Sequence, residues 1–327
     1  MNKLMWPIPT GLKDLLPEEA KRKRTLEANL AALFERWGYE EVITPTFEYY
    51  ETLAMDLGSE AEDELFKFFD REGRLVALRP DMTTPIARLV ATRLRNSPMP
   101  LRLYYLANVF RYEAPQAGRQ REFYQAGVEF IGEPDARADA EVIALAVEAL
   151  ESSGLRDFQI SLGQIEVFNG LMEETGLSPE QKKKVKETIA RRNLVGLEQL
   201  LIEYRVATRQ SESILRLPHL HGGTEVFTQA RNLTTNVRAQ AALDNLERVF
   251  ELLDGYGQTK RVCVDLGVLR GFDYYTGVVF EGYTADLGFP LCGGGRYDRL
   301  LGKFGFDCPA TGFALGLERL ILSLIKG

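Results

Sequence analysis

The chain has 327 residues, 45% of them apolar, and its 40 basic and 47 acidic residues give a formal charge of −7. This balance is ordinary for a globular protein and argues against indiscriminate nucleic-acid binding, while leaving room for a local basic pocket. The length predicts one large domain with a smaller inserted or appended unit.

The first half of the chain alternates between helical and strand patterns. Apolar side chains in residues 17–37 recur at helical spacing, with Pro17 near the start and Gly38 as a stop. The pattern then predicts, in order, a strand over 39–45, a hairpin with arms at 65–69 and 75–79, a helix within 79–94, and a strand over 101–113 paired with an arm ending near Gly132. Antiparallel pairs therefore dominate this half.

The second half places a helical block between β-rich parts. Asp135 or Asp139 is suited to cap a helix, residues 158–163 predict a strand, and residues 169–235 are helix-like with almost no strand signal. Strand patterns return at 261–267, at 274–283 and from Gly288, before a closing helix marked by Leu317, Leu320, Ile321 and Leu324. We therefore predict an α+β fold, in which residues 1–168 and 236–327 form an antiparallel core domain and 169–235 form an inserted helical subdomain.

Residues 110–129, FRYEAPQAGRQREFYQAGVE, are more polar than a core hairpin requires. Because side chains alternate along a strand, Arg121, Phe123, Gln125 and Glu129 point to one face of its second arm. Arginines such as Arg111 at a hairpin tip bind phosphate or carboxylate oxygens well, but they are also typical of a solvated tip. The inward-facing polar groups, which need partners, favour a ligand site.

Two further segments combine polar and aromatic residues. In LRPDMT, Asp81 and Thr83 are suited to bind an ammonium group, although both are also ordinary helix caps. In LRGFDYYTG, Arg270 precedes Tyr274 and Tyr275, and a tyrosine pair there fits the core or an interface as well as a pocket. Each segment alone leaves both interpretations open.

The C-terminal part adds a glycine run and an arginine. CGGGRYDRL allows close approach to a ligand or to a neighbouring strand, but neither a Walker P-loop nor a dinucleotide GxGxxG is present. Arg319 just inside the last helix is either solvated or part of a phosphate pocket. The segment PHLHGG, which holds both histidines, lacks the carboxylate or cysteine residues that would complete a zinc site, so we expect no metal.

The cysteines and the N-terminus indicate the compartment. Cys263, Cys292 and Cys308 form no CxxC pair, which favours a reducing compartment. Residues 1–19 hold prolines and acids where a signal peptide is apolar, and no apolar run approaches the roughly 18 residues of a membrane span. We expect a cytoplasmic protein without a membrane partner.

Taken in order, these segments resemble the catalytic domain of a class II aminoacyl-tRNA synthetase of the histidyl type. TGLKDLLPEE with GYEEVITPTFE is similar to the first motif of that class, FRYEAPQAGRQREFYQAGVEFIG to the second, and GFALGLERL to the third. LRGFDYYTGVVFE and GGGRYDRLLG resemble two segments peculiar to histidyl enzymes. The resemblance covers nearly the whole chain except the helical block, and it implies an antiparallel sheet flanked by helices.

The resemblance also implies roles for individual residues. The residues that would bind histidine are Asp81, Thr83, Arg111, Gln125, Glu129, Arg270, Tyr274 and Tyr275. Those that would form an ATP site, whether active or vestigial, are Arg111, Arg121 and Arg319. Synthetases have a glutamate where this chain has Asp81, one methylene shorter, which affects recognition of the amino group.

A paralogous family, the regulatory subunits of ATP phosphoribosyltransferase, is the preferred assignment. LRPDMTTPIAR, DLGVLRGFDYYTG and GGGRYDRLLGKFG are similar to its versions, and the chain ends at Gly327, directly after the third motif, where a synthetase continues into an anticodon-binding domain. Membership implies a short-form catalytic subunit as partner, the first step of histidine biosynthesis, and feedback inhibition by histidine. It implies no cofactor, no aminoacylation and no nucleic acid.

Two alternatives stay open beside this assignment. One is a histidyl-tRNA synthetase core that activates histidine with ATP and Mg²⁺, and the other is a stand-alone histidine-binding module. Both resembling families form dimers through the first-motif region, so Pro45 and its surroundings are the expected interface.

Overall fold

A mixed sheet organises the part of the chain that the computed structural model describes, residues 6–55, 63–112, 120–269 and 274–326. Within these residues the strand order is β1-β5-β6-β12-β11-β10-β7-β9-β8. The strands are β1 (Glu40–Glu41), β5 (Leu101–Phe110), β6 (Glu122–Ile131), β7 (Gln159–Gln164), β8 (His221–Gly222), β9 (Val262–Asp265), β10 (Val278–Tyr283), β11 (Cys292–Arg296) and β12 (Ala310–Gly316). Pairing is parallel between β1 and β5 and between β7 and β9, and antiparallel between the other neighbours, so the predicted antiparallel character is confirmed.

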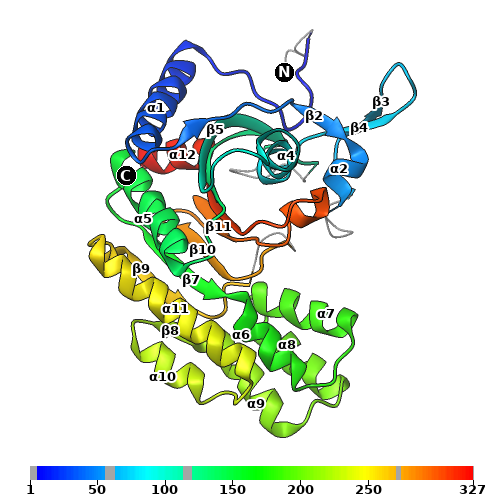
Figure 1. Ribbon diagram of the computed structural model, residues 1–327, viewed down its shortest axis with the longest axis vertical. Helices are drawn as coiled ribbons and strands as arrows, with labels where there is room; N and C mark the ends of the chain where they lie inside the picture. The colour runs from blue at the N-terminus through cyan, green and yellow to red at the C-terminus, as the bar shows by residue number, and fades with distance from the viewer. Residues whose placement is uncertain (1–5, 56–62, 113–119, 270–273, 327) are drawn as a thin grey trace, which may run out of the picture.

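A second, smaller sheet lies at the upper right of Figure 1. Its order is β2-β4-β3, from β2 (Phe47–Tyr49), β3 (Lys67–Phe69) and β4 (Leu75–Leu78). Strands β3 and β4 form the predicted hairpin. The helices that follow these strands are α2 (Tyr50–Ala54) and α4 (Thr83–Leu89), and α4 continues into the π-helical turn η1 (Val90–Leu94).

One face of the large sheet is covered by helices. Helix α1 (Pro17–Arg36) and helix α5 (Ala136–Ser152), which Asp135 caps, pack against the face of β6 that carries Ala126 and Val128. The other face of β6 carries Phe123 and Gln125, which line a cavity. The predicted alternation along this strand is therefore confirmed.

A helical segment follows β7 and forms the lower lobe in Figure 1. Its helices are α6 (Ile165–Glu173), α7 (Pro179–Ala190), α8 (Leu194–Glu203), α9 (Thr208–Arg216), the 3₁₀ turn η2 (Leu217–His219), α10 (Glu225–Arg231) and α11 (Val237–Gly255). Helix α11 lies wholly beyond residue 235, where the sequence pattern placed the end of the insertion, and it packs against both α5 and α6. A single apolar cluster runs from the sheet into these helices.

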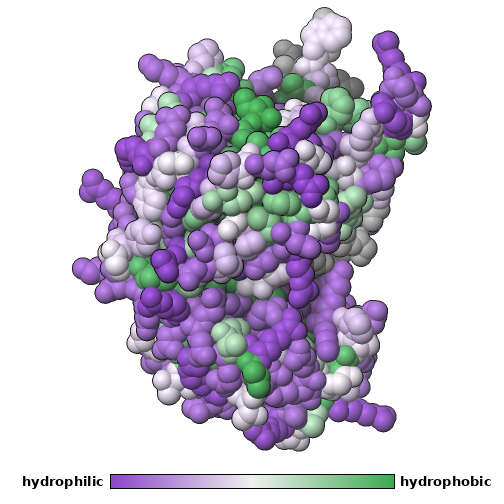
Figure 2. Space-filling model, viewed as in Figure 1, coloured by the Kyte–Doolittle hydropathy of each residue, from purple (hydrophilic) through white to green (hydrophobic). Residues whose placement is uncertain are grey.

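The chain returns to the sheet through η3 (Thr259–Arg261), passes η4 (Leu301–Phe304) and ends in α12 (Leu317–Lys326), where a closing helix was predicted. Within the described ranges, no helix is both long and apolar enough to cross a membrane. Figure 2 shows a mostly hydrophilic face, with hydrophobic patches that are larger in the upper half.

Candidate functional site

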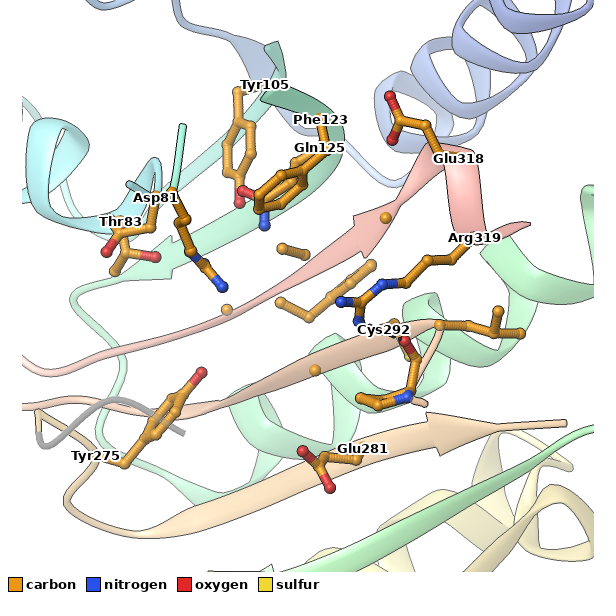
Figure 3. Close-up of a pocket in the computed structure, with 18 of the residues that line it drawn as sticks. Asp81, Thr83, Tyr105, Phe123, Gln125, Tyr275, Glu281, Cys292, Glu318 and Arg319 are labelled. Atoms are coloured by element: carbon orange, nitrogen blue, oxygen red, sulfur yellow. Dashed lines mark hydrogen bonds between the residues drawn. The ribbon is translucent and has the colours of Figure 1, made fainter. Parts of the chain in front are cut away.

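A cavity of about 240 Å³ lies over the face of the large sheet formed by β6, β12, β11 and β10. Figure 3 shows Asp81 and Thr83 at one end and Glu318 and Arg319, from the start of α12, at the other. The predicted site residues that line it are Asp81, Thr83, Arg111, Gln125, Tyr274, Tyr275 and Arg319. The fold therefore gathers segments that are far apart in sequence into one pocket.

Asp81 and Thr83 lie at the N-terminal end of α4, where both structural and ligand-facing roles were considered. Asp81 Oδ1 accepts a hydrogen bond from the backbone N–H of Thr84 at 3.0 Å, so it caps the helix and also lines the cavity. Thr83 Oγ1 donates a hydrogen bond to Glu129 Oε1 at 2.8 Å. Both side chains thus have a fixed orientation beside the cavity.

Gln125 brings a buried acceptor into the cavity. Its side chain is 9% exposed, and its β-strand neighbours in register are Ala107 and Gly316. Among the described residues, none donates a hydrogen bond to Gln125 Oε1. A buried acceptor left in this state costs about 1–3 kcal/mol, so a ligand that supplies a donor here recovers that free energy.

Glu129 lies beneath the floor of the cavity, which differs from the expectation that it lines the pocket. Its side chain is 1% exposed, and it accepts hydrogen bonds from Thr83 and from the Tyr297 hydroxyl. Burial raises the pKa of Glu129 to about 8, and the Asp81 charge acts in the same direction, whereas the two hydroxyl donors oppose the rise. The carboxyl group is therefore mostly protonated at neutral pH.

Gly312 allows Glu129 to sit this close to β12. The two residues are register partners in the antiparallel pair β6–β12. A Cβ atom at Gly312 would overlap Glu129 Oε2 and the Val128 carbonyl oxygen, so only glycine leaves room for the carboxylate.

Tyr274 and Tyr275 enter the cavity just before β10. Their rings are 5.0 Å apart, and Tyr274 is also 5.8 Å from the ring of Tyr297. Tyr274 is buried in an apolar cluster with Tyr105 and Tyr297 while lining the cavity, so the core and pocket interpretations both hold for it. Burial raises the pKa of both Tyr274 and Tyr275, which keeps the two phenols protonated.

Two arginines give the cavity positive charge. Arg111 donates from Nε to the Pro80 carbonyl oxygen at 2.9 Å, and its guanidinium lies 5.2 Å from the Phe123 ring centroid. Arg319 donates from Nη1 to the Pro290 carbonyl oxygen at 2.9 Å and lies 5.1 Å from the ring centroid of Phe289. Each guanidinium is held in place and still borders the cavity.

Of the remaining two predicted arginines, Arg121 is described by the structure and does not line the cavity. Arg121 donates from Nη1 to the Thr10 carbonyl oxygen at 3.3 Å, and its guanidinium lies 4.0 Å from the ring centroid of Tyr112. The structure therefore differs from the expectation of an ATP-facing Arg121, since this side chain packs on the N-terminal segment. Arg270 lies outside the described residues.

The structure adds cavity residues that the sequence patterns did not single out. They are Tyr105, Glu281, Cys292, Tyr297 and Glu318, among others. Tyr297 follows the glycine run, which was noted only for its backbone. Glu318 accepts the backbone N–H of Tyr124 on both carboxylate oxygens at 3.0 Å, and burial raises its pKa. Contacts of this kind depend on tertiary neighbours rather than on strand period.

The arrangement is suited to a small zwitterion. Acceptors at Asp81 and Gln125 fit a ligand's ammonium or ring N–H groups, and the guanidinium groups of Arg111 and Arg319 fit an anion. The described lining contains no Cys–His or Ser–His pair that would support covalent catalysis. The lining thus offers hydrogen-bond acceptors and two guanidinium groups to a ligand of this kind.

Fold and site together define a class II synthetase-like domain of the histidyl type, and the model of the family described as Histidyl-tRNA synthetase matches residues 11–320. The ATP phosphoribosyltransferase regulatory subunit of Moorella thermoacetica is 52% identical over 316 residues, which are 97% of this chain and 81% of that protein. The chain belongs to the family of ATP phosphoribosyltransferase regulatory subunits within this class. The family assignment rests on this sequence identity, because the regulatory subunit from Moorella is longer than the chain and a comparison of lengths does not support it.

Two solved structures show the same fold. One, titled an ATP phosphoribosyltransferase regulatory subunit/histidyl-tRNA synthetase from Bacillus halodurans, is 38% identical with a TM-score of 0.92, covering 99% of this chain and 84% of that one. The other, a histidine–tRNA ligase subunit from Alicyclobacillus acidocaldarius, is 28% identical with a TM-score of 0.83 and full coverage of both chains. The α+β class II architecture predicted from sequence is confirmed.

Proposed function

We propose that this chain is the regulatory subunit of an ATP phosphoribosyltransferase, that it acts in the cytoplasm with a short-form catalytic subunit, and that it serves the first step of histidine biosynthesis. The 52% identity to the Moorella regulatory subunit carries this proposal. The subunit itself performs no catalysis and no aminoacylation, and it needs neither a cofactor nor nucleic acid.

Histidine is the ligand we propose for the cavity. As the end product of the pathway, it would act there as the feedback signal. Supporting this, the buried Gln125 Oε1 and Asp81 offer acceptors, while Arg111 offers charge for the ligand carboxylate. Feedback inhibition requires histidine to bind the inhibited state of the assembly more tightly than the active state. A cavity whose lining comes from several separate elements of the fold is a suitable place for such a difference.

Mixing the purified chain with a short-form catalytic subunit tests the proposal. We expect a complex on size-exclusion chromatography and an increased rate of phosphoribosyl-ATP formation. A catalytic subunit whose rate is unchanged, and which elutes separately from the folded chain, would refute the regulatory function.

The synthetase core remains the second candidate because Arg111 and Arg319 both border the cavity. Under this alternative ATP and Mg²⁺ would bind beside histidine, and the guanidinium groups would stabilise developing charge. Histidine-dependent exchange of pyrophosphate into ATP is the measurement that separates the two. We expect no exchange, and exchange at a synthetase-like rate would favour the alternative.

We further propose that the chain self-associates as a dimer through the first-motif region around Pro45. Large apolar side chains are exposed there, with Ile43 83% and Phe69 71% exposed. Phe47 and Phe68 add a ring pair with centroids 5.7 Å apart on the small sheet. Exposed apolar groups that cluster in this way are typical of an interface.

A further inference from the structure

We infer that Arg79 is a positioning residue that joins the exposed first-motif segment, residues 43–47, to two charged groups bordering the cavity, Asp81 and Arg111. Through this link, a second copy of the chain docked on the segment and a ligand in the cavity strengthen each other's binding. The inference rests on the proposed dimer and on histidine as the proposed ligand, and it adds a form of regulation to that site.

Arg79 follows β4 and is almost wholly buried. The residue is 5% exposed, and its guanidinium donates four hydrogen bonds, all to neutral oxygen atoms. An arginine stays charged in proteins, so a buried guanidinium depends on acceptors of this kind. The acceptors come from two separate segments of the chain. The planar group therefore holds both segments in fixed positions around one side chain.

Two of these bonds hold the first-motif segment from its buried side. Arg79 Nη1 donates to the carbonyl oxygens of Thr44 at 2.8 Å and Pro45 at 3.1 Å. The backbone N–H of Arg79 donates to the Thr46 carbonyl oxygen at 3.1 Å. The solvent side of the same segment carries Ile43, which is 83% exposed and belongs to the proposed dimer interface. A second copy packed on this side chain therefore fixes a backbone that is bonded to Arg79.

The other two bonds reach the base of the β5–β6 hairpin. Arg79 donates from Nε to the Asn108 carbonyl oxygen at 2.8 Å and from Nη2 to Asn108 Oδ1 at 3.0 Å. The carbonyl oxygen of Arg79 accepts the backbone N–H of Phe110 at 2.9 Å. Asn108 in turn donates from Nδ2 to Glu122 on β6 at 2.9 Å. Arg79 thus fixes the strand end from which Arg111 extends.

Asp81 and Arg111 take their positions from this arrangement. Asp81 lies two residues after Arg79 and lines the cavity. Arg111, which also lines it, donates from Nε to the carbonyl oxygen of Pro80, the residue between Arg79 and Asp81, at 2.9 Å. A docked copy that fixes the interface segment therefore leaves less ordering of the cavity for the ligand to accomplish. Linkage makes this effect reciprocal, so the ligand also favours the dimer.

A double-mutant cycle tests the coupling. Histidine binding is measured by calorimetry, at a protein concentration where wild type is dimeric, for wild type, Ile43→Asp, Arg79→Lys and the variant with both changes. Arg79→Lys keeps the charge, but an ammonium group cannot match the planar fork. We expect Ile43→Asp to weaken histidine binding by about tenfold when Arg79 is present and by less than about twofold in Arg79→Lys.

Two further variants support the cycle. Arg93→Lys, on the exposed side of η1, makes the same chemical change in solvent and should leave the effect of Ile43→Asp at about tenfold. Asn108→Ala removes the side-chain acceptor of Arg79 Nη2 and serves in case Arg79→Lys does not fold. It should reduce the effect of Ile43→Asp on histidine binding.

Reciprocity provides a measurement on the unaltered chain. In sedimentation equilibrium, saturating histidine should lower the dissociation constant of the dimer by about 100-fold, because a dimer has two sites that each bind about tenfold more tightly. Equal effects of Ile43→Asp with and without Arg79 would overturn the inference. So would a dimer that histidine does not strengthen, a monomeric wild type, or a wild type that does not bind histidine. The activation assay with the catalytic subunit decides the regulatory function separately.

Discussion

The buried carboxyl group of Glu129 predicts a particular dependence of folding stability on pH. Its pKa is raised from an ordinary 4.5 to about 8 in the folded protein, chiefly by burial. A folded state that binds a proton more tightly than the unfolded chain has its full stability below the unfolded pKa and loses stability as pH rises through the folded pKa. Glu129→Gln removes this titration while keeping the size of the side chain.

The magnitude follows from the two pKa values. Between 4.5 and about 8 the unfolding free energy contributed by this group falls by about 1.4 kcal/mol for each pH unit. From pH 5 to pH 8 the wild type should therefore lose about 3.5 kcal/mol relative to Glu129→Gln, because the slope is less than full at both ends of this range. The sign is fixed by burial, which disfavours the charged form.

Urea unfolding followed by circular dichroism at pH 5, 6, 7 and 8 measures this difference. Glu198→Gln, on the exposed side of α8, is the matched control because it makes the same chemical change in solvent. A difference between wild type and Glu129→Gln that stays constant within about 1 kcal/mol would refute the reasoning, as would one that grows in favour of wild type.

Three further predictions concern packing, a buried ion pair and assembly. Gly312→Ala should destabilise the fold or displace Glu129 and weaken histidine binding, whereas Gly255→Ala, at the end of α11 and away from the cavity, should be tolerated because its Cβ would meet nothing within 4 Å; calorimetry and thermal unfolding compare the two. Asp139→Ala should cost up to about 3–5 kcal/mol in urea unfolding, because it removes the buried partner of Arg296 at 2.9 Å and leaves only Asp298, at 3.1 Å, to pair with this charge; a loss under 1 kcal/mol would contradict this. Ile43→Asp should convert a dimer into the 36.9 kDa monomer in sedimentation equilibrium, and a persisting dimer would place the interface elsewhere.

Much of the local structure could be predicted from the sequence because it depends on periodic patterns. The alternation in β6 identified Gln125 as inward-facing, and the apolar spacing identified α1 and α12 at nearly their observed bounds. The predicted strand over 39–45 shrinks to the two residues of β1, since only Glu40 and Glu41 are in register with β5 and the backbone bond from Val42 to Tyr104 follows at its end.

Depth and distance were harder to predict from periodicity. Strand alternation predicts that Arg121, Gln125 and Glu129 share one face of β6. It does not predict that the missing side chain of Gly312 leaves room for the Glu129 carboxylate below the cavity lining, or that contacts with Thr10 and Tyr112 keep Arg121 away from the cavity. These outcomes depend on neighbours from other elements.

Tyr297 and α11 also show that periodic sequence patterns do not predict contacts between separate elements. The glycine run before Tyr297 drew attention to the backbone, while the Tyr297 hydroxyl donates a hydrogen bond to a carboxylate on β6. Helix α11 has a regular apolar stripe, but its membership in the helical segment follows from packing against α5 and α6. The division of the chain at residues 169 and 235 stays a prediction.

Histidine inhibition of the assembled complex tests the central claim most directly. The rate of phosphoribosyl-ATP formation is measured against histidine concentration for wild type and for Gln125→Leu, which removes the buried acceptor in the cavity. We expect both to activate the catalytic subunit equally, with the midpoint of inhibition at least about tenfold higher in the variant. The same midpoint for both complexes would contradict the claim, because histidine would then act at a site other than this cavity.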